Sequence, residues 1–281
     1  MSPALLDHLY VPDNTSPADA LARTTHLAIG AHQDDLEIFA YHGIETCYDR
    51  ADMWFGGVTV TDGGGSARTG EYSDYSDEQM KAVRVEEQNE AARLGRYAFQ
   101  AQLGVPSRVI KDPAAHGPVV AQLTELLRAT RPDALYLHNP ADKHATHIGV
   151  LLACVSALRE LAPDDRPRTI VGCEVWRDLD WLPDGAKIPL PVGRLPELER
   201  DLIAVFRSQV AGGKDYVAAT LGRRRANATY FNSHAIDAAA AVTFAMDLSA
   251  LATDDSLTLT DLVTPHLDAF RADVLRKLAA F

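Results

Sequence analysis

Short apolar runs and longer segments of helical periodicity alternate along the first two thirds of the chain. The short runs predict strands at residues 27–31, 53–61, 99–103, 108–111, 134–138 and 169–176. The longer segments predict helices at residues 38–48, 76–95, 119–130 and 142–161. This alternation is typical of an α/β fold with a Rossmann-like, doubly wound, mostly parallel sheet and helices on both faces.

The last third of the chain has a less regular pattern. Residues 181–192 contain three prolines and predict a loop or a short hairpin. The remaining elements expected are helices at 195–209, 216–230 and 260–281 and a strand at 238–247. Because there is no linker or internal repeat, we expect a single α/β domain over residues 1–281. Its core would span about residues 24–178, and the C-terminal part at about 179–281 would cover that core.

Charge and cysteine content exclude several classes of protein. The 27 basic and 39 acidic residues give a formal net charge of −12, which disfavours binding to nucleic acid or to an anionic membrane surface. The three cysteines form no disulfide framework, and no segment approaches the roughly 20 apolar residues of a membrane span. A cytoplasmic protein without a membrane segment is therefore expected.

Titratable residues gather in two places, each directly after a predicted strand. The first is the run Ala31-His32-Gln33-Asp34-Asp35, and the second extends from His138 to His147. In a doubly wound sheet, ligands bind beyond the carboxyl ends of the strands. We therefore expect these two clusters to meet at one site.

The residue types in the two clusters suit a catalytic zinc ion, which takes three protein ligands and keeps one position open. His32 and Asp35 lie three residues apart on a turn, so their side chains can converge on one ion. His144 and His147 have the same spacing at a helix start and share a face. In the alternative interpretation, Asp34 and Asp35 only cap a helix and His144 is an ordinary first-turn residue. The presence of two clusters, each after its own strand, favours the metal.

These motifs resemble those of the PIG-L/LmbE-like N-acetylglucosaminyl deacetylases. The first family motif reads Ala-His-Pro-Asp-Asp, which Ala31–Asp35 matches with Gln33 in place of proline. The second reads His-Pro-Asp-His, of which residues 144–147 keep both histidines. Weaker similarities occur at Arg84 with Glu87, at residues 91–95 and at Ser208-Gln209. The resemblance extends over most of residues 27–210.

The resemblance implies an LmbE-like fold and a metal-dependent N-deacetylase, a hydrolase that removes the N-acetyl group of an amino-sugar conjugate. His32, Asp35 and His147 would bind one Zn²⁺ per chain. Asp34 would be the general base that takes a proton from the metal-bound water. His144 would stabilise the oxyanion or protonate the leaving amine. Members of the family often form assemblies, so a homo-oligomer is a further expectation.

The chain also departs from the family motifs. Thr146 stands where the family has an aspartate that supports the histidines, and Asp142 is a candidate substitute. Candidates for supporting or substrate-binding roles are Asp142, Arg68, Arg84 and His138. Trp176 and Trp181 fit either a sugar-binding loop or core packing.

Three alternative functions remain open at this point. The chain could hydrolyse a different amide, or it could hold zinc without turnover. A nucleotide-binding regulator rests on fold analogy alone. The loop Gly63–Gly70 has the glycine spacing of a phosphate-binding loop, but Glu71-Tyr72 follow where lysine and a hydroxyl residue are required. We therefore expect this loop to lie over the active site.

Overall fold

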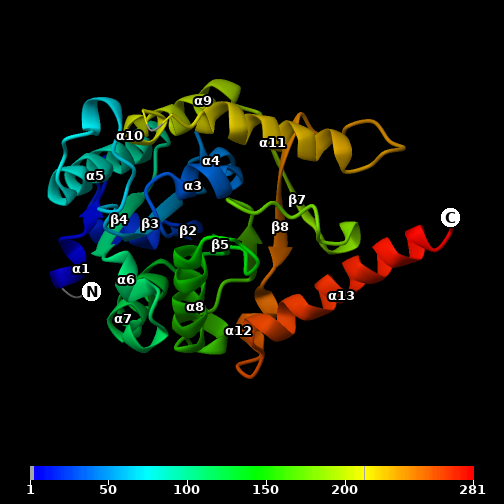
Figure 1. Cartoon of the computed structure of the whole chain (residues 1–281). Coiled ribbons are helices and arrows are strands. Elements are labelled where there is room, and N and C mark those ends of the chain that lie inside the picture. The colour runs from blue at the N-terminus through cyan, green and yellow to red at the C-terminus, as the bar shows by residue number, and fades with distance from the viewer. Residues whose placement is uncertain (1–2, 212) are drawn as a thin grey trace.

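The computed structural model describes residues 3–211 and 213–281, which form an eight-stranded sheet between helices (Figure 1). The strands are β1 (Leu9–Tyr10), β2 (His26–Gly30), β3 (Phe55–Thr61), β4 (Phe99–Val105), β5 (Ala134–His138), β6 (Thr169–Cys173), β7 (Ile188–Val192) and β8 (Ala241–Asp247). Their order in the sheet is β1-β4-β3-β2-β5-β6-β8-β7. The five strands from β4 to β6 are parallel, whereas β1, β8 and β7 are each antiparallel to their neighbours. The expected α/β fold with a doubly wound sheet is confirmed.

Helices cover both faces of the sheet. They are α1 (Pro3–Leu6), α2 (Pro17–Ala22), α3 (Asp35–Phe39), α4 (Tyr41–Cys47), α5 (Asp77–Leu94), α6 (Ser107–Ile110), α7 (Gly117–Thr130), α8 (Ala145–Arg159), α9 (Pro196–Ala204), α10 (Arg207–Val210), α11 (Tyr216–Tyr230), α12 (Ser249–Thr253) and α13 (Leu259–Leu278). In Figure 1, α7, α8 and α12 lie below the sheet, and α3, α4, α9 and α11 lie above it. No helix of the described residues is long and apolar enough to cross a membrane.

The two faces of the sheet carry separate apolar cores, because successive side chains of a strand point to opposite faces. On β2, Leu27 and Ile29 pack in one cluster with residues of α7 and α8 such as Leu123 and Val150. Ala28 between them belongs to the other cluster, with residues of α3 such as Phe39. The central strands are therefore buried on both faces, as expected for a parallel sheet between helices.

Three predicted elements differ from the structure. The strand expected at 108–111 is wrong: β4 continues to Val105, and α6 follows Pro106, whose fixed φ suits a helix start. The helix expected at 38–48 begins earlier and is interrupted at Ala40, which has φ −106° and ψ 15°. The helix expected at 195–209 is likewise interrupted at Phe206, which has ψ 62°.

The proline-rich segment before α9 contains strand β7, at the edge of the sheet. Pro189 and Pro191 are exposed, and Leu190 and Val192 are buried. Proline is tolerated in an edge strand because one side of that strand has no hydrogen-bonding partner. The strand predicted at 238–247 is confirmed as β8, which pairs with β7. The sequence analysis did not predict β1, α1, α2 or α12.

Helix α11 is fixed to the body by one buried arginine. The Arg224 guanidinium, 2% exposed, donates to the Glu199 carboxylate at 2.6 Å. It also donates to the backbone carbonyls of Glu37 at 2.9 Å and Ile38 at 2.7 Å. Arg224 therefore connects α11 with both α9 and α3, next to the segment that contains Asp34 and Asp35.

Replacing Arg224 by methionine should lower the free energy of unfolding by about 3–5 kcal/mol, because the buried Glu199 carboxylate loses its counter-charge. Urea denaturation of both proteins measures the difference. The neighbouring Arg225 is exposed, so Arg225→Met is the matched control and should change stability by less than about 0.5 kcal/mol. Equal effects of the two substitutions would contradict a structural role for the buried ion pair.

Candidate active site

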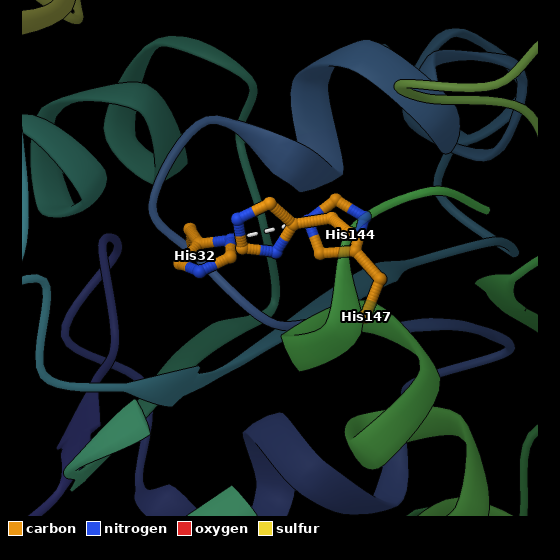
Figure 2. Close-up of side chains that lie close together, drawn as sticks. All are labelled: His32, His144 and His147. Carbon is orange, nitrogen blue, oxygen red and sulfur yellow. Dashed lines mark hydrogen bonds between the residues drawn. The ribbon is translucent and has the colours of Figure 1, made fainter. Parts of the chain in front are cut away.

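The two polar clusters of the sequence meet at the point where the strand order reverses. β2 lies between β3 and β5 in the sheet, so the chain leaves it toward one side and later returns on the other. His32 follows β2, and His144 and His147 lie where α8 begins after β5 (Figure 2). A crevice beyond the carboxyl ends of two such strands is the usual ligand site of open α/β sheets.

His32, Asp35 and His147 lie close together, and Asp35 faces the two histidines with different carboxylate oxygens. With one atom per residue, two overlapping groups here could hold a metal ion: His32, His144 and His147, and Asp35, His138 and His147. His32 Nδ1 lies 3.1 Å from His147 Nε2 and 3.3 Å from Asp35 Oδ2, and His147 Nε2 lies 3.4 Å from Asp35 Oδ1. Zinc bonds of about 2.0–2.2 Å at tetrahedral angles separate ligand atoms by about 3.3–3.5 Å. The separations between these three side chains are therefore close to those between the ligands of one metal ion.

The Asp35 carboxylate is held in place by the backbone at the end of β2. Its Oδ2 atom accepts hydrogen bonds from the amides of Ala31 at 3.1 Å and His32 at 2.7 Å. Burial opposes its negative charge, but the neighbouring His147 and His138 and hydrogen bonds with the side chains of His138 and His32 hold the pKa of Asp35 well below its usual range. Asp35 is therefore a carboxylate, the form in which it can bind a cation.

Asp142 orients the two histidines at the start of α8. Its Oδ2 atom lies 3.5 Å from His147 Nδ1, and its Oδ1 atom accepts the amide hydrogen of His144 at 2.9 Å. The Trp176 amide also donates to Oδ2, at 3.1 Å. A carboxylate on the far nitrogen of a ligating histidine fixes the ring orientation and makes the ligand more basic. At 3.5 Å the contact with His147 Nδ1 is not a hydrogen bond in this structure, and the buried Thr146 hydroxyl also has no hydrogen-bond partner.

His138 lies behind the three ligand atoms. Its ring stacks on His147 with centroids 3.9 Å apart, and its Nε2 atom accepts the Ala31 amide hydrogen at 2.9 Å. Burial lowers the pKa of His138 to about 4, so the ring is neutral. Its Nε2 atom also lies 3.4 Å from Asp35 Oδ2, so His138, like Asp35 and His147, belongs to a buried group that could hold a metal ion.

Asp34 has an unusual backbone conformation for a residue with a side chain. Its φ is 99° and its ψ is −27°, and its side chain lies beside the buried guanidinium of Arg84 at 3.1 Å. Arg84 also donates to the carbonyl of Gln33, and so holds both sides of this strained turn. Burial raises the pKa of Asp34 to about 6, against the opposing charge of Arg84.

Arg84 is itself fixed by residues far apart in the sequence. It donates to Glu87 at 3.0 Å, one turn further along α5, and to the Ser208 hydroxyl at 3.3 Å. Ser208 in turn donates to Glu87 through both its amide and its hydroxyl, each at 2.7 Å. The weak sequence similarities at Arg84, Glu87 and Ser208 therefore form one network that positions Asp34.

Gln33, which replaces the proline of the family motif, is anchored by its side chain. It is 1% exposed, and its amide donates to the Thr61 carbonyl at the end of β3 at 3.2 Å. The Thr61 hydroxyl donates back to the Ala31 carbonyl at 2.7 Å. These contacts restrict the turn that a proline would otherwise stiffen.

His144 faces the ligand atoms across the site. Its ring meets the His32 ring edge-on, with centroids 4.9 Å apart. Figure 2 shows His32, His144 and His147 close together. Burial lowers the pKa of His144 to about 4, with His147 and His32 acting in the same direction. His144 is therefore neutral near pH 7 and can donate one N–H to a bound molecule.

A cavity of about 410 Å³ opens above these residues. Its walls include His32, Asp34, Asp35, Arg84 and His144 from the candidates of the sequence, together with part of the Gly-rich loop after β3. Among the lining residues that the sequence analysis did not identify are Lys111, Tyr216, Thr220 and Arg223. Lys111 follows α6, where the sequence predicted a strand. Tyr216 begins α11, whose bounds the sequence predicted but whose packing beside the cavity depends on the tertiary fold.

The structure does not bring Arg68 into this cavity. Its guanidinium donates to the Gly64 carbonyl at 2.9 Å and pairs with Asp77 at the start of α5. Trp176, in contrast, lines the cavity and meets the Tyr216 ring edge-on, with centroids 6.1 Å apart. Of the two tryptophans considered for sugar binding, Trp176 is therefore at the site, whereas Trp181 packs against the core.

A protein-family model matches part of the chain. Residues 27–158, which contain both histidine motifs, match the family model described as PIG-L: GlcNAc-PI de-N-acetylase. No curated protein matches the chain.

Solved structures share the fold over most of the chain. An N,N'-diacetylchitobiose deacetylase from Pyrococcus horikoshii is 19% identical, with a TM-score of 0.61 over 89% of this chain and 93% of that one. A zinc-inhibited form of the teicoplanin deacetylase Orf2 is 14% identical, with a TM-score of 0.57 over 80% of this chain and 97% of that one. GalB, a 4-carboxy-2-hydroxymuconate hydratase from Pseudomonas putida KT2440, is also 14% identical, with a TM-score of 0.57 over 80% and 96%. The fold therefore occurs with more than one reaction.

Proposed function

Because residues 27–158 match the PIG-L family model, we propose that this chain is a zinc-dependent hydrolase that removes the N-acetyl group of an amino-sugar conjugate. The observation that carries this proposal is the convergence of His32, Asp35 and His147, whose nitrogen and oxygen atoms lie 3.1–3.4 Å apart. His32 and Asp35 line the cavity, and His147 is fully buried beside them. Asp34 lies beside them, held by Arg84.

One zinc ion bound by His32, Asp35 and His147 would lower the pKa of a water molecule from about 15.7 to about 7 and polarise an amide carbonyl. Side chains of the protein carry out the proton transfers. Asp34 takes the proton of the attacking water on its carboxylate and returns it to the nitrogen of the leaving amine. The products are acetate and the free amino sugar, and Asp34 is again ionised.

His144 and Arg84 have separate tasks in this reaction. The neutral His144 ring donates its N–H to the amide oxygen as that oxygen gains negative charge. Arg84 touches Asp34 but not the reacting atoms, so it positions the base and keeps its turn in the strained conformation. Asp142 holds the His147 ring in the orientation that ligation requires.

The cavity walls fit a sugar. Trp176 and Tyr216 present aromatic rings beside the polar floor, and an aromatic face packs well against the C–H face of a sugar ring. A volume of about 410 Å³ is within the range of small-molecule sites, roughly 300–1,000 Å³. The substrate class we propose is therefore an N-acetylated amino sugar with a substituent that extends toward the mouth of the cavity.

The test is acetate release by the zinc-loaded protein from a panel of N-acetylglucosamine conjugates with neutral, anionic and peptidic substituents. We expect at least one conjugate to yield acetate and free amine in equal amounts. Release of other acyl groups in preference to acetate would indicate a different amide hydrolase. Addition of water to an unsaturated carboxylic acid, without acetate release from any conjugate, would overturn the proposal in favour of hydration, the reaction named for GalB.

A further inference from the structure

Helix α13 extends away from the rest of the molecule (Figure 1). Only its first turn is anchored, where Leu259 and Leu262 pack against the core. None of its 20 residues is buried. The outer part of this helix therefore has no partner among the residues that the structure describes.

An apolar stripe follows one face of the exposed part of α13. Leu267, Phe270, Val274 and Leu278 are spaced by three and four residues, so they lie in line on the helix surface. They are 48%, 43%, 39% and 66% exposed, and Leu275, 54% exposed, borders them. Most of the exposed large apolar side chains in the described part of the chain belong to α13 or follow it. A contiguous exposed apolar stripe of this kind is typical of a surface that binds a partner.

The charges of α13 are divided between its two halves. Residues 259–268 carry Asp261 and Asp268 and neither lysine nor arginine, a net charge of −2. Residues 269–278 carry Arg271, Arg276 and Lys277 against one acid, Asp273, a net charge of +2. The two halves therefore have opposite charge. In an antiparallel pair, the negative half of one helix would lie opposite the positive half of the second copy. The opposed helix dipoles favour the same arrangement.

We propose that α13 pairs antiparallel with α13 of a second copy of this chain, through the stripe Leu267, Phe270, Val274 and Leu278. A twofold axis near the middle of the stripe makes the contact isologous, so one sequence supplies both complementary surfaces. With about 1.5 Å of rise per residue, α13 is roughly 30 Å long, enough for a short two-stranded contact. No residue of α13 lines the cavity.

Light scattering on the full chain, over a wide range of concentration, tests the pairing. We expect a mass of twice the 30.5 kDa chain mass at high concentration, and the single-chain mass on dilution. The double substitution Phe270→Glu with Val274→Glu should give the single-chain mass throughout, with an unchanged circular dichroism spectrum. Ala269→Glu with Ala272→Glu adds the same charge on the opposite, exposed face and should still pair.

A wild-type chain that stays monomeric at every concentration would overturn the proposal. So would an oligomer that survives the Phe270→Glu and Val274→Glu substitutions, because its interface would lie elsewhere. Vesicles containing anionic lipid provide a further arm. Binding of a monomeric wild-type chain, lost in the same double variant, would assign the stripe to a membrane surface instead.

Cysteine cross-linking tests the orientation of the helices. In an antiparallel pair only residues near the twofold axis meet their own copies, so Arg271→Cys should form an intermolecular disulfide on oxidation and Lys277→Cys should not. The native Cys47, Cys154 and Cys173 are buried and will not interfere. Cross-linking of both variants would show a parallel pair and contradict the charge argument.

Discussion

Replacing His32 or His147 by alanine should abolish zinc binding and lower kcat/KM by at least about 10³-fold, equivalent to about 4 kcal/mol of transition-state stabilisation. The two residues come from segments more than a hundred positions apart, yet their ring nitrogens lie 3.1 Å from each other. Removing either leaves two protein ligands, too few for a stable catalytic zinc site. Elemental analysis of the purified proteins, with an acetate-release assay, measures both effects.

The exposed His234 provides the control for this prediction. His234→Ala should retain about one zinc per chain and wild-type activity. Far-ultraviolet circular dichroism should be unchanged in all three variants, because none of the three histidines lies within a strand of the sheet. Full zinc retention in both His32→Ala and His147→Ala would separate the two motifs and remove the basis of the proposed function.

The sequence was enough to predict that the two motifs lie on the same side of the sheet, because all parallel strands have their carboxyl ends there. Once the runs at 27–31 and 134–138 are recognised as strands, the residues that follow them must emerge at the same edge of the sheet. Whether those two strands are neighbours is not local information, because the order depends on how the crossovers pack. The adjacency of β2 and β5 is what joins His32 to His147.

The support of Asp34 could not be read from the sequence in the same way. Arg84 and Ser208 are separated by 124 positions and meet only because α10 starts after a break at Phe206. The helix pattern expected there was continuous, and a continuous helix would not present Ser208 as this turn does. The positive φ of Asp34 also depends on tertiary contacts. Arg84 stabilises this conformation by donating hydrogen bonds to the Gln33 carbonyl and to the Asp34 carboxylate.

Arg68 was a candidate for substrate binding, but in the structure it binds Asp77 and the Gly64 carbonyl instead. A basic residue in a Gly-rich loop after a strand suggests a substrate contact, but the nearby Asp77 at the first turn of α5 offers an opposite charge. A short sequence separation makes that local pair easy to form. The ion pair leaves Arg68 outside the cavity, whereas Lys111, in a segment with the wrong predicted element, lines it.

Replacing Asp34 by asparagine should lower kcat by about 10²–10⁴-fold while zinc content and KM change little. Asparagine keeps the shape and a hydrogen bond to Arg84 but cannot accept the proton of the attacking water. Asp35→Asn is the matched control, since the adjacent carboxylate is expected to hold the metal: that variant should lose zinc as well as activity. Metal analysis and steady-state kinetics on the two variants therefore separate two chemically identical side chains.

The pH dependence of the wild type gives an independent measurement of the same group. Burial raises the pKa of Asp34 to about 6, and the charge of a bound zinc ion acts in the opposite direction. Because the base acts only when ionised, log kcat/KM should fall with a slope of one below a pH at or under about 6. Asp34→Asn should lose this acidic limb. An unchanged limb in the variant, or a wild-type rate for Asp34→Asn, would assign the base to another residue.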